Sequence, residues 1–288
     1  MYKKIILGTA QFGMNYGISN TNGEIKLAEV FKILNFLKQK KIASLDTARS
    51  YKSSEKKIGE YFKKTKKKFD IITKFSFKNN NSVKNQFDES SKMLGYAPNT
   101  ILAHSYKDYM NPKFHKQIDI LKEKYPIMNI GVSLYNVSEL NKILNYKKPD
   151  LVQIPINILD KRFLDPKICK KLKKKSIKIL GRSIFLQGLF FKKQKFIFKN
   201  FKGVKNKFLK ILKIAEHEKM TLAELSLNWA FHLKEVDNII LGIDRLSHLK
   251  KNLDITKKRI SKESLKQIKK INLNNNNIVR PYLWKIKQ

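Results

Sequence analysis

Short runs of apolar residues recur along the chain, and each run has the length of a β-strand. Eight such runs lie at residues 3–8, 43–47, 69–75, 100–105, 128–134, 151–156, 177–183 and 238–243. Several are apolar at consecutive positions, which is typical of strands covered on both faces in a parallel sheet. We therefore expect these eight segments to be the strands of a parallel sheet.

The segments between these runs have the periodicity of amphipathic helices. Apolar residues repeat at i, i+3, i+4 and i+7 from Leu27, and a similar pattern covers residues 58–62. The segment "TLAELSLNWAFHL" begins with Thr221 and Glu224, which have the spacing of a capping box. The pattern therefore predicts a helix after most of the strands.

Alternation of strand and helix, repeated eight times within 288 residues, predicts a (β/α)8 TIM barrel. A doubly wound open sheet is the main alternative, because it has the same alternation. No long linker rich in Pro, Gly or Ser divides the chain, so we expect one domain over residues 1–288. Two segments lie outside the alternation: residues 184–202, and a tail from about residue 271 that contains "NLNNNN".

The charge of the chain is strongly positive. Lys and Arg number 62 against 23 Asp and Glu, which gives a formal net charge of +39. Such a charge can serve nucleic-acid or membrane binding. Here the excess is nearly all lysine, is spread along the chain, and accompanies many Asn and Ile residues, so we interpret it mainly as compositional bias on solvated faces. It would still attract small anionic ligands at low salt.

Compartment and membrane association also leave signals in a sequence. Cys169 is the single cysteine, which excludes an intrachain disulfide and fits a reducing compartment. The start "MYKKIILGTAQFG" meets glycine too early for a secretory signal, and no run approaches the roughly 18 apolar residues of a membrane span. We therefore expect a cytoplasmic protein without a membrane partner.

Four chemically distinctive residues lie at or just beyond the ends of three consecutive predicted strands. Asp46 and Tyr51 follow the second strand, Lys74 lies near the end of the third, and His104 near the end of the fourth. Each alone has a structural explanation: Asp46 could cap a turn, and His104 could be a satisfied structural histidine. Because catalytic groups of such barrels lie at the carboxyl ends of strands, the four together predict an active site.

These four side chains suit the reduction of a carbonyl group. A phenol has a pKa near 10, and a lysine ammonium within a few Å lowers it. A carboxylate beside the lysine keeps the ammonium charged and oriented, and a histidine can orient the carbonyl and stabilise charge on its oxygen. Hydride would reach the carbonyl carbon while the tyrosine delivers a proton to the oxygen.

The stretches "DTARSY", "ITK" and "LAHS" resemble the aspartate–tyrosine–lysine–histidine tetrad of the aldo-keto reductase superfamily. The similarity extends over nearly the whole chain. It includes "LGTAQFG" for the first loop, "GVSLYN" for the fifth strand, "VQIPIN" for the sixth, "RSIFLQGLF" for the seventh, and "IILGIDRLSHLKKNL" for the closing segment.

The resemblance implies a role for each matched residue. Tyr51 would be the general acid, Lys74 and Asp46 would tune and orient it, and His104 would position the carbonyl. The implied cofactor-binding residues are Thr9 beside the nicotinamide, Ser133 and Gln153 at its carboxamide, and Arg182, Ser183, Gly242 and Asn252 along the ring, pyrophosphate and adenosine. The family binds NADP(H), or less often NAD(H), in extended form, and no residue is assigned to a metal.

The chain departs from the family pattern outside the tetrad. Leu134 replaces the usual asparagine after Ser133, and Arg182 lies where many members stack a tyrosine on the nicotinamide. Leu241 replaces a proline and Lys251 a glutamate in the closing segment. Lys251 adds positive charge that suits a 2′-phosphate, so we expect NADP(H), with NAD(H) as the alternative.

Two further features have competing explanations. Residues 189–203, "LFFKKQKFIFKNFKG", interleave aromatics with lysines, as in surfaces that bind single-stranded nucleic acid. The simpler interpretation is a barrel-rim segment whose phenylalanines pack inward. In the tail, Trp284 either contacts the substrate or anchors the tail to the barrel.

We therefore predict an NADP-dependent aldo-keto reductase that acts on a small-molecule aldehyde or ketone. The second hypothesis is a barrel that binds the cofactor as a sensor or regulatory subunit with little turnover. The third and weakest is a basic nucleic-acid-binding protein. No oligomeric state is predicted.

Overall fold

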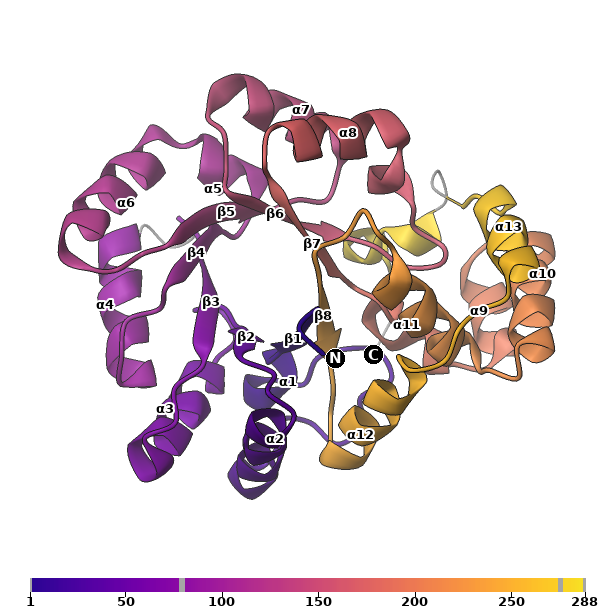
Figure 1. The fold of residues 1–288 in the computed structure, drawn as a ribbon, viewed down its shortest axis with the longest axis horizontal. Helices are drawn as coiled ribbons and strands as arrows, with labels where there is room; N and C mark the ends of the chain where they lie inside the picture. Colours follow the sequence, from indigo (N-terminus) through magenta and orange to yellow (C-terminus); the bar gives the residue numbers. More distant parts are fainter. Residues whose placement is uncertain (1, 78–80, 274–276, 287–288) are drawn as a thin grey trace.

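A computed structural model describes residues 2–77, 81–273 and 277–286. In these residues, eight parallel strands follow one another in chain order and close into a barrel (Figure 1). The strands are β1 (Ile5–Gly8), β2 (Ser44–Asp46), β3 (Asp70–Phe75), β4 (Thr100–Ala103), β5 (Asn129–Ser133), β6 (Leu151–Pro155), β7 (Lys178–Arg182) and β8 (Asn238–Gly242). Every strand lies inside its predicted segment, so the predicted (β/α)8 barrel is confirmed and the open sheet is excluded.

Helices surround the strands on the outside of the barrel (Figure 1). They are α1 (Ala10–Gly13), α2 (Leu27–Gln39), α3 (Ser54–Thr65), α4 (Val83–Leu94), α5 (Tyr106–Met110), α6 (Pro112–Lys124), α7 (Val137–Tyr146), α8 (Pro166–Lys174), α9 (Gln194–Asn200), α10 (Lys205–His217), α11 (Leu222–His232), α12 (Leu246–Ile255) and α13 (Lys262–Lys270). Short 3-10 helices are η2 (Arg162–Leu164), η3 (Leu186–Phe191), η4 (Asn277–Val279) and η5 (Pro281–Leu283).

Local signals in the sequence explain individual helices. The capping box at the start of α11 is confirmed, because the Thr221 side chain accepts from the Glu224 backbone and the Glu224 carboxylate accepts from the Thr221 backbone. In α2 the apolar stripe buries Val30 and Leu34, whereas Leu27 at the first turn stays 42% exposed. The apolar face of α2 is therefore buried against the barrel from Val30 onward, and not at its first residue.

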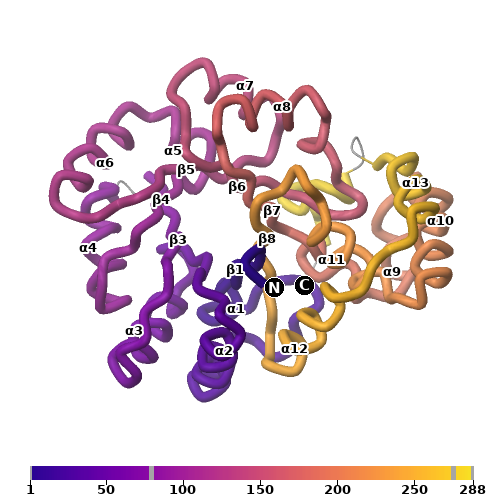
Figure 2. The backbone as a smooth tube through the Cα atoms, viewed as in Figure 1, coloured from indigo at the N-terminus to yellow at the C-terminus, as the bar shows by residue number. Residues whose placement is uncertain are grey.

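The barrel closes where its first strand meets its last. β1 pairs with β2 on one side and with β8 on the other, so Gly8 lies opposite both Asp46 and Gly242. Figure 2 shows the chain running once around the ring, which brings α12 back beside α2. The loops after β1, β2 and β8 are consequently neighbours at one end of the barrel.

Alternation along the strands separates the barrel interior from the layer under the helices. Ile5 and Leu7 belong to the large core shared with the helices, whereas Ile6 belongs to a separate cluster. That inner cluster consists of Ile6, Ile72, Leu102, Leu151, Leu180 and Ile240. Since residues two apart in a strand face the same side, the next inward layer toward the carboxyl ends is Gly8, Lys74, His104, Gln153, Arg182 and Gly242. This layer contains five of the eleven predicted site residues: Lys74, His104, Gln153, Arg182 and Gly242.

The segment 184–202 forms η3 and α9 on the rim of the barrel. Phe190, Ile197 and Phe201 are buried, while Phe191 is 58% exposed. Most lysines of the segment are exposed. The inward packing of its apolar side chains is the barrel-rim arrangement that the simpler interpretation predicts.

The tail returns to the barrel and packs on this rim segment. The Trp284 ring contacts the Phe201 ring at a centroid distance of 5.2 Å, and its indole nitrogen donates to the Asn277 carbonyl at 3.0 Å. Residues 274–276 of the "NLNNNN" run lie outside the described residues. Trp284 therefore anchors the tail.

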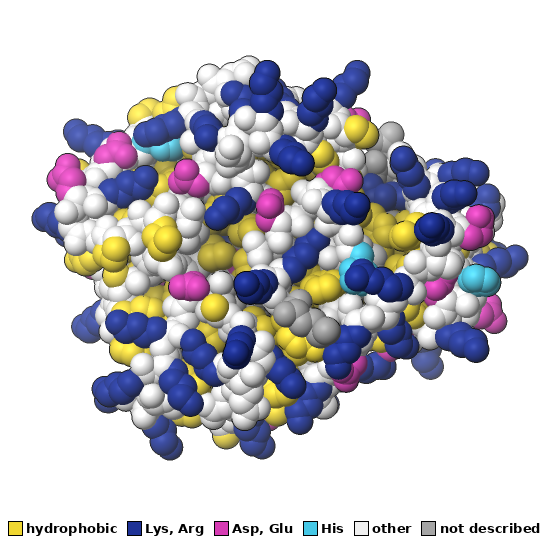
Figure 3. Space-filling view, viewed as in Figure 1, with side chains coloured by type: hydrophobic (Ala, Val, Ile, Leu, Met, Phe, Trp, Pro, Cys, Tyr) yellow, Lys and Arg dark blue, Asp and Glu magenta, His cyan; other side chains and the backbone are white. Residues whose placement is uncertain are grey.

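Positive side chains are spread over the surface. Figure 3 shows Lys and Arg side chains over the whole visible face, with few acidic groups between them and no single basic patch. This distribution fits solvated faces. No helix in residues 2–77, 81–273 and 277–286 combines the length and apolar character needed to cross a bilayer.

Candidate active site

A buried ion pair lies at the carboxyl ends of β2 and β3. The Lys74 ammonium is 2.7 Å from one carboxylate oxygen of Asp46 and donates a second hydrogen bond of 2.8 Å to the Thr47 carbonyl. The Gln153 amide donates to the other Asp46 oxygen at 2.7 Å. The side chains of Lys74 and Asp46 are only 1% and 5% exposed. Both charges are therefore satisfied and fixed in position.

Tyr51 lies directly beside this ion pair. It follows β2 in a tight turn in which its backbone nitrogen donates to the Ala48 carbonyl at 2.9 Å. The Lys74 ammonium is 5.1 Å from the centre of the phenol ring, and the His104 ring meets that ring edge-on with centroids 6.4 Å apart. The four residues of the predicted tetrad thus come together at one end of the barrel.

Burial controls the proton affinities of this cluster. It raises the pKa of Tyr51 above the usual range of a phenol, the Asp46 charge raises it further, and Arg182 lowers it to a smaller extent. Burial lowers the pKa of Lys74, and Asp46 opposes that change. The lowered pKa predicted for Tyr51 is wrong, because burial and the nearby Asp46 charge, which both raise the pKa, outweigh the lowering by Arg182. The phenol therefore stays protonated at neutral pH.

A second buried carboxylate holds the loop that carries Tyr51. Glu55 is 1% exposed and accepts hydrogen bonds from Thr73 at 2.7 Å and from Ser90 at 2.9 Å. Arg49 in the loop donates to Glu55 at 3.1 Å and to Glu89 at 2.9 Å. The loop is thereby tied to β3 and α4. Sequence reasoning missed Glu55, because a glutamate in the first turn of a helix is ordinarily a solvated residue.

The cluster opens into a cavity of about 650 Å³ that extends from Tyr51 to α12. Eight predicted site residues line it: Thr9, Asp46, Tyr51, Gln153, Arg182, Ser183, Gly242 and Asn252. Lys74 lies beneath this lining, buried against Asp46. Ser133, on β5, is 4% exposed, and neither Ser133 nor His104 is part of the described lining.

Basic residues at the α12 end of the cavity are paired with acids. The Lys251 ammonium is 3.0 Å from Glu224, and Arg245 is 3.2 Å from Asp244. His248 lies 2.5 Å from the other oxygen of Asp244. The positive charge predicted from Lys251 is therefore largely offset locally.

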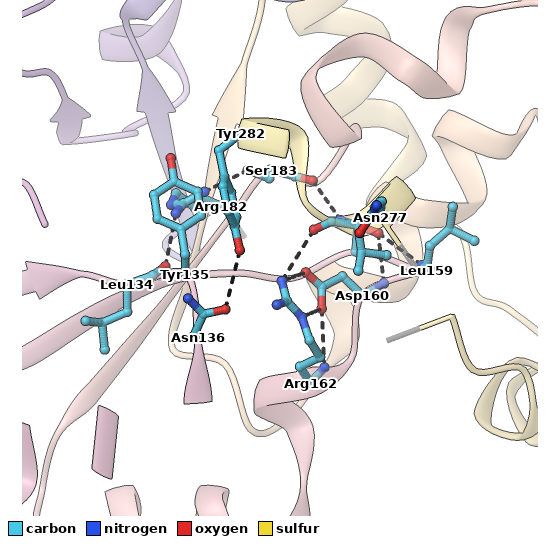
Figure 4. Close-up of polar contacts among 12 residues, drawn as sticks. Leu134, Tyr135, Asn136, Leu159, Asp160, Arg162, Arg182, Ser183, Asn277 and Tyr282 are labelled. Atoms are coloured by element: carbon cyan, nitrogen blue, oxygen red, sulfur yellow. Dashed lines mark hydrogen bonds and ion pairs between the residues drawn. The ribbon is translucent and has the colours of Figure 1, made fainter. Parts of the chain in front are cut away.

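The end of the cavity near Tyr51 contains residues that sequence reasoning did not assign. Tyr16 and Gln187 line the cavity. Tyr135, two residues beyond the end of β5 and outside the described lining, stacks on the guanidinium of Arg182 at 4.2 Å (Figure 4). An aromatic residue just beyond a strand end was the available signal for Tyr135, within "GVSLYN".

The loop after β7 is conformationally constrained. Ser183, Leu186 and Gln187 have φ values of 61°, 47° and 51°, in the left-handed region that is costly for residues other than glycine. Such conformations concentrate at functional sites, where surrounding contacts hold them. Here the Ser183 hydroxyl accepts from Arg182 at 3.1 Å, and the Gln187 carbonyl accepts from the Ile18 backbone at 2.9 Å.

Comparison with known proteins places this geometry in a family. The sequence model of the protein family described as "Aldo/keto reductase family" matches residues 4–273 of this chain. The structure is similar to that of a thermostable aldo-keto reductase, Tm1743, in complex with the inhibitor epalrestat, with a TM-score of 0.70 and 18% identity over 93% of this chain and 94% of that one. It is also similar to the structure of PA4992 from Pseudomonas aeruginosa, with a TM-score of 0.64 and 18% identity over 91% of this chain and 90% of that one. No curated protein matches the sequence.

Proposed function

Because the chain belongs to the aldo/keto reductase family, whose members are oxidoreductases, we propose that it reduces an aldehyde or ketone to an alcohol with NADP(H) as cofactor. The observation that carries this proposal is the buried Asp46–Lys74 pair beside Tyr51 in the wall of a large cavity. In a barrel of this kind, the carboxyl ends of the strands are where catalytic groups gather.

Tyr51 is the proposed proton donor. Its phenol is held protonated by burial, which is the state that a general acid needs before the reaction. A bound reduced nicotinamide would supply a hydride to the carbonyl carbon. The developing alkoxide oxygen is far more basic than a phenolate, so the proton passes from Tyr51 to that oxygen.

Lys74 and Asp46 support this transfer without changing their own protonation. Once Tyr51 has lost its proton, the Lys74 ammonium stabilises the phenolate. Asp46 keeps Lys74 charged and fixed, and Gln153 in turn holds Asp46. His104, edge-on to Tyr51, is proposed to orient the carbonyl oxygen. Charges fixed before the reaction stabilise its transition state without reorganisation.

The cavity fits an extended dinucleotide. Its volume of about 650 Å³ lies in the range of cofactor pockets, about 300–1,000 Å³. A Cβ atom built at Gly242 would meet nothing within 4 Å, so the wall is open there. Thr9, Gln153, Arg182 and Ser183 are proposed contacts at the ring end. Gly242 and Asn252 would contact the pyrophosphate and adenosine. Ser133 is the weakest of the proposed contacts, because it is 4% exposed and outside the described lining.

NADP(H) and NAD(H) differ by one 2′-phosphate, whose natural location is the α12 end of the cavity. Arg245 and Lys251 favour NADP(H), since either exposed basic side chain can exchange its acidic partner for a phosphate. Their pairing with Asp244 and Glu224 favours NAD(H) as the second candidate. Affinities for the two cofactors decide between them.

The test is a titration of NADPH and NADH followed by protein fluorescence, then a panel of aldehydes, ketones and sugars with the tighter cofactor. Tyr51→Phe should lower kcat by about 10²–10⁴-fold and still bind the cofactor. Tyr146→Phe is the matched control, because it removes a phenol that is 44% exposed on α7 and outside the cavity lining. That variant should keep the wild-type rate.

Three results would count against the proposal. Undiminished NADPH oxidation by Tyr51→Phe would refute Tyr51 as the acid. Tight dinucleotide binding without turnover on any carbonyl would favour a sensor or regulatory barrel. A salt-sensitive gel shift with no response to either dinucleotide would favour nucleic-acid binding.

A further inference from the structure

Arg182 presents a positive charge at the reacting end of the cavity. It is the last residue of β7 and belongs to the same inward layer as Lys74 and Gln153. Its side chain is partly exposed and lines the cavity together with Tyr51. The reacting end therefore contains a cation besides the one buried with Asp46.

This guanidinium has no acidic partner in the described part of the chain. Its hydrogen bonds go to neutral acceptors, the Leu134 carbonyl at 3.0 Å and the Ser183 hydroxyl at 3.1 Å. None of the ion pairs among residues 2–77, 81–273 and 277–286 includes Arg182. Asp46, the carboxylate that shares this end of the cavity, is already held by Lys74 and Gln153.

The hydrogen-bonding capacity of Arg182 is only partly used. A guanidinium has five N–H donors in a planar fork, and two of those on Arg182 are engaged. The fork matches the two oxygens of a carboxylate or phosphate. A partly exposed cation with free donors in a cavity wall is therefore equipped to bind an oxyanion.

Two tyrosine rings hold this guanidinium in place, one stacked on it and the other edge-on behind the first. Tyr135 stacks on Arg182 at 4.2 Å, and the Tyr282 ring meets Tyr135 at a centroid distance of 4.9 Å (Figure 4). The Tyr282 hydroxyl lies 3.5 Å from the Asn136 side-chain oxygen. Tyr282 belongs to the tail, so the tail supports a residue of the cavity from outside.

Contact with the cofactor ring does not neutralise the charge of Arg182. The basic residues suited to a 2′-phosphate, Arg245 and Lys251, lie at the α12 end, and the pyrophosphate is assigned to Gly242 and Asn252. A nicotinamide ring carries no acid, and its oxidised form is itself positive. An anion at the ring end would therefore come with the substrate.

We propose that the carbonyl substrate bears a carboxylate or phosphate group that Arg182 binds while the carbonyl lies at Tyr51, and that Tyr282 positions Arg182 through Tyr135. This specificity rests on the proposed reductase function. It makes Arg182 a substrate-recognition residue and Tyr282 a positioning residue.

The test compares acidic substrates with neutral analogues that carry the same reacting carbonyl. One arm uses 4-carboxybenzaldehyde against its methyl ester, and the other uses glyceraldehyde 3-phosphate against glyceraldehyde, so that carboxylate and phosphate are distinguished. Wild-type protein should prefer the acid by kcat/KM in at least one arm. Arg182→Leu should reduce that preference about 10–100-fold, the effect of losing a hydrogen-bonded charge pair. Arg182→Lys keeps the charge but not the planar fork of donors, so its preference for the acid should lie between those of the wild type and Arg182→Leu.

Lys148→Gln controls for net charge, because it removes one exposed cation just before β6, at the opposite end of the barrel. It should keep the wild-type preference. Tyr282→Ala, at a residue 48% exposed, should reduce the preference several-fold, and Tyr282→Phe, which keeps the ring, should restore it. Circular dichroism melts would verify that each variant is folded.

Equal kcat/KM for acid and neutral substrate in both arms would overturn the inference, as would an unchanged preference in Arg182→Leu. Failure of the reductase function is distinguished by binding. If no carbonyl turns over, calorimetric titration with 4-carboxybenzaldehyde still reports the acid site. If Arg182→Leu abolishes this binding, the acid site exists even though no reaction is catalysed. If Arg182→Leu still binds the acid, Arg182 does not form such a site.

Discussion

The ammonium of Lys74 lies 2.7 Å from the carboxylate of Asp46, and both side chains are almost completely buried. Isolated charges in such a position would be strongly destabilising, and a buried pair is stable only when its remaining hydrogen-bonding groups are also satisfied. Thr47 and Gln153 supply those contacts. The pair is therefore fixed in position, and its removal should affect the stability of the fold and the activity of the site in separable ways.

Lys74→Met should destabilise the protein by about 3–5 kcal/mol, because it leaves the Asp46 carboxylate buried without its partner. The double variant Asp46→Asn/Lys74→Met should recover most of this loss, since it removes both charges. Urea unfolding measures the free energies. A double variant less stable than Lys74→Met would contradict the explanation. Carbonyl reduction should be severely impaired in both variants, which separates the catalytic role from the stability effect.

The raised pKa of Tyr51 predicts the pH dependence of reduction. A general acid must be protonated, and burial keeps this phenol protonated above the usual pKa of about 10. Single-turnover reduction at saturating cofactor should therefore show no loss assignable to Tyr51 between pH 7 and about pH 10, and should fall only at higher pH. A decline between about pH 8 and 9 that is absent in Tyr51→Phe would instead indicate a lowered pKa.

Gly13 offers a test of how closely the Tyr51 loop is packed. A Cβ atom at this position would lie 1.9 Å from the Tyr51 carbonyl oxygen, so Gly13→Ala must displace the loop. We expect reduction to fall by about 100-fold, because a displacement of about 1 Å at a catalytic group has that effect. The measurement is kcat/KM on any active carbonyl.

Gly59→Ala is the matched control for that variant. Its Cβ atom would lie 1.9 Å from the Met93 carbonyl oxygen, where α3 packs on α4, away from the described cavity lining. Both variants should lower the melting temperature. Only Gly13→Ala should lower activity at a temperature where both are folded. Equal activity in the two variants would refute the link between Gly13 and Tyr51.

The sequence predicted the barrel and the convergence of the tetrad for a physical reason. Strand alternation places inward residues two apart, so Ile72 and Lys74, or Leu180 and Arg182, must occupy successive layers of one interior. Contacts between distant segments have no such periodic signal. The edge-on contact of Tyr282 with Tyr135 depends on where the tail returns, and no local pattern encodes that path.

Charge balance was also beyond local sequence reasoning. Lys251 indicated a phosphate site when considered alone, but the fold brings Glu224 from α11 to within 3.0 Å of it. The direction of the Tyr51 pKa shift was likewise not predictable, because it depends on burial, which the spacing of residues does not reveal. Residue types were therefore predictable, and their electrostatic environment was not.

The charge of the whole chain leads to a last prediction. With 62 basic against 23 acidic side chains, most lysines lack an acidic partner and repel one another across the folded surface. Raising ionic strength from about 0.01 M to 0.1 M shortens the screening length from about 30 Å to 10 Å, which should weaken this repulsion and raise the melting temperature by several degrees. The gain should be the same for NaCl and KCl and should level off above about 0.3 M, because ionic screening does not depend on cation type. A melting temperature that falls with added salt would mean that attractive surface pairs outweigh the repulsion among lysines.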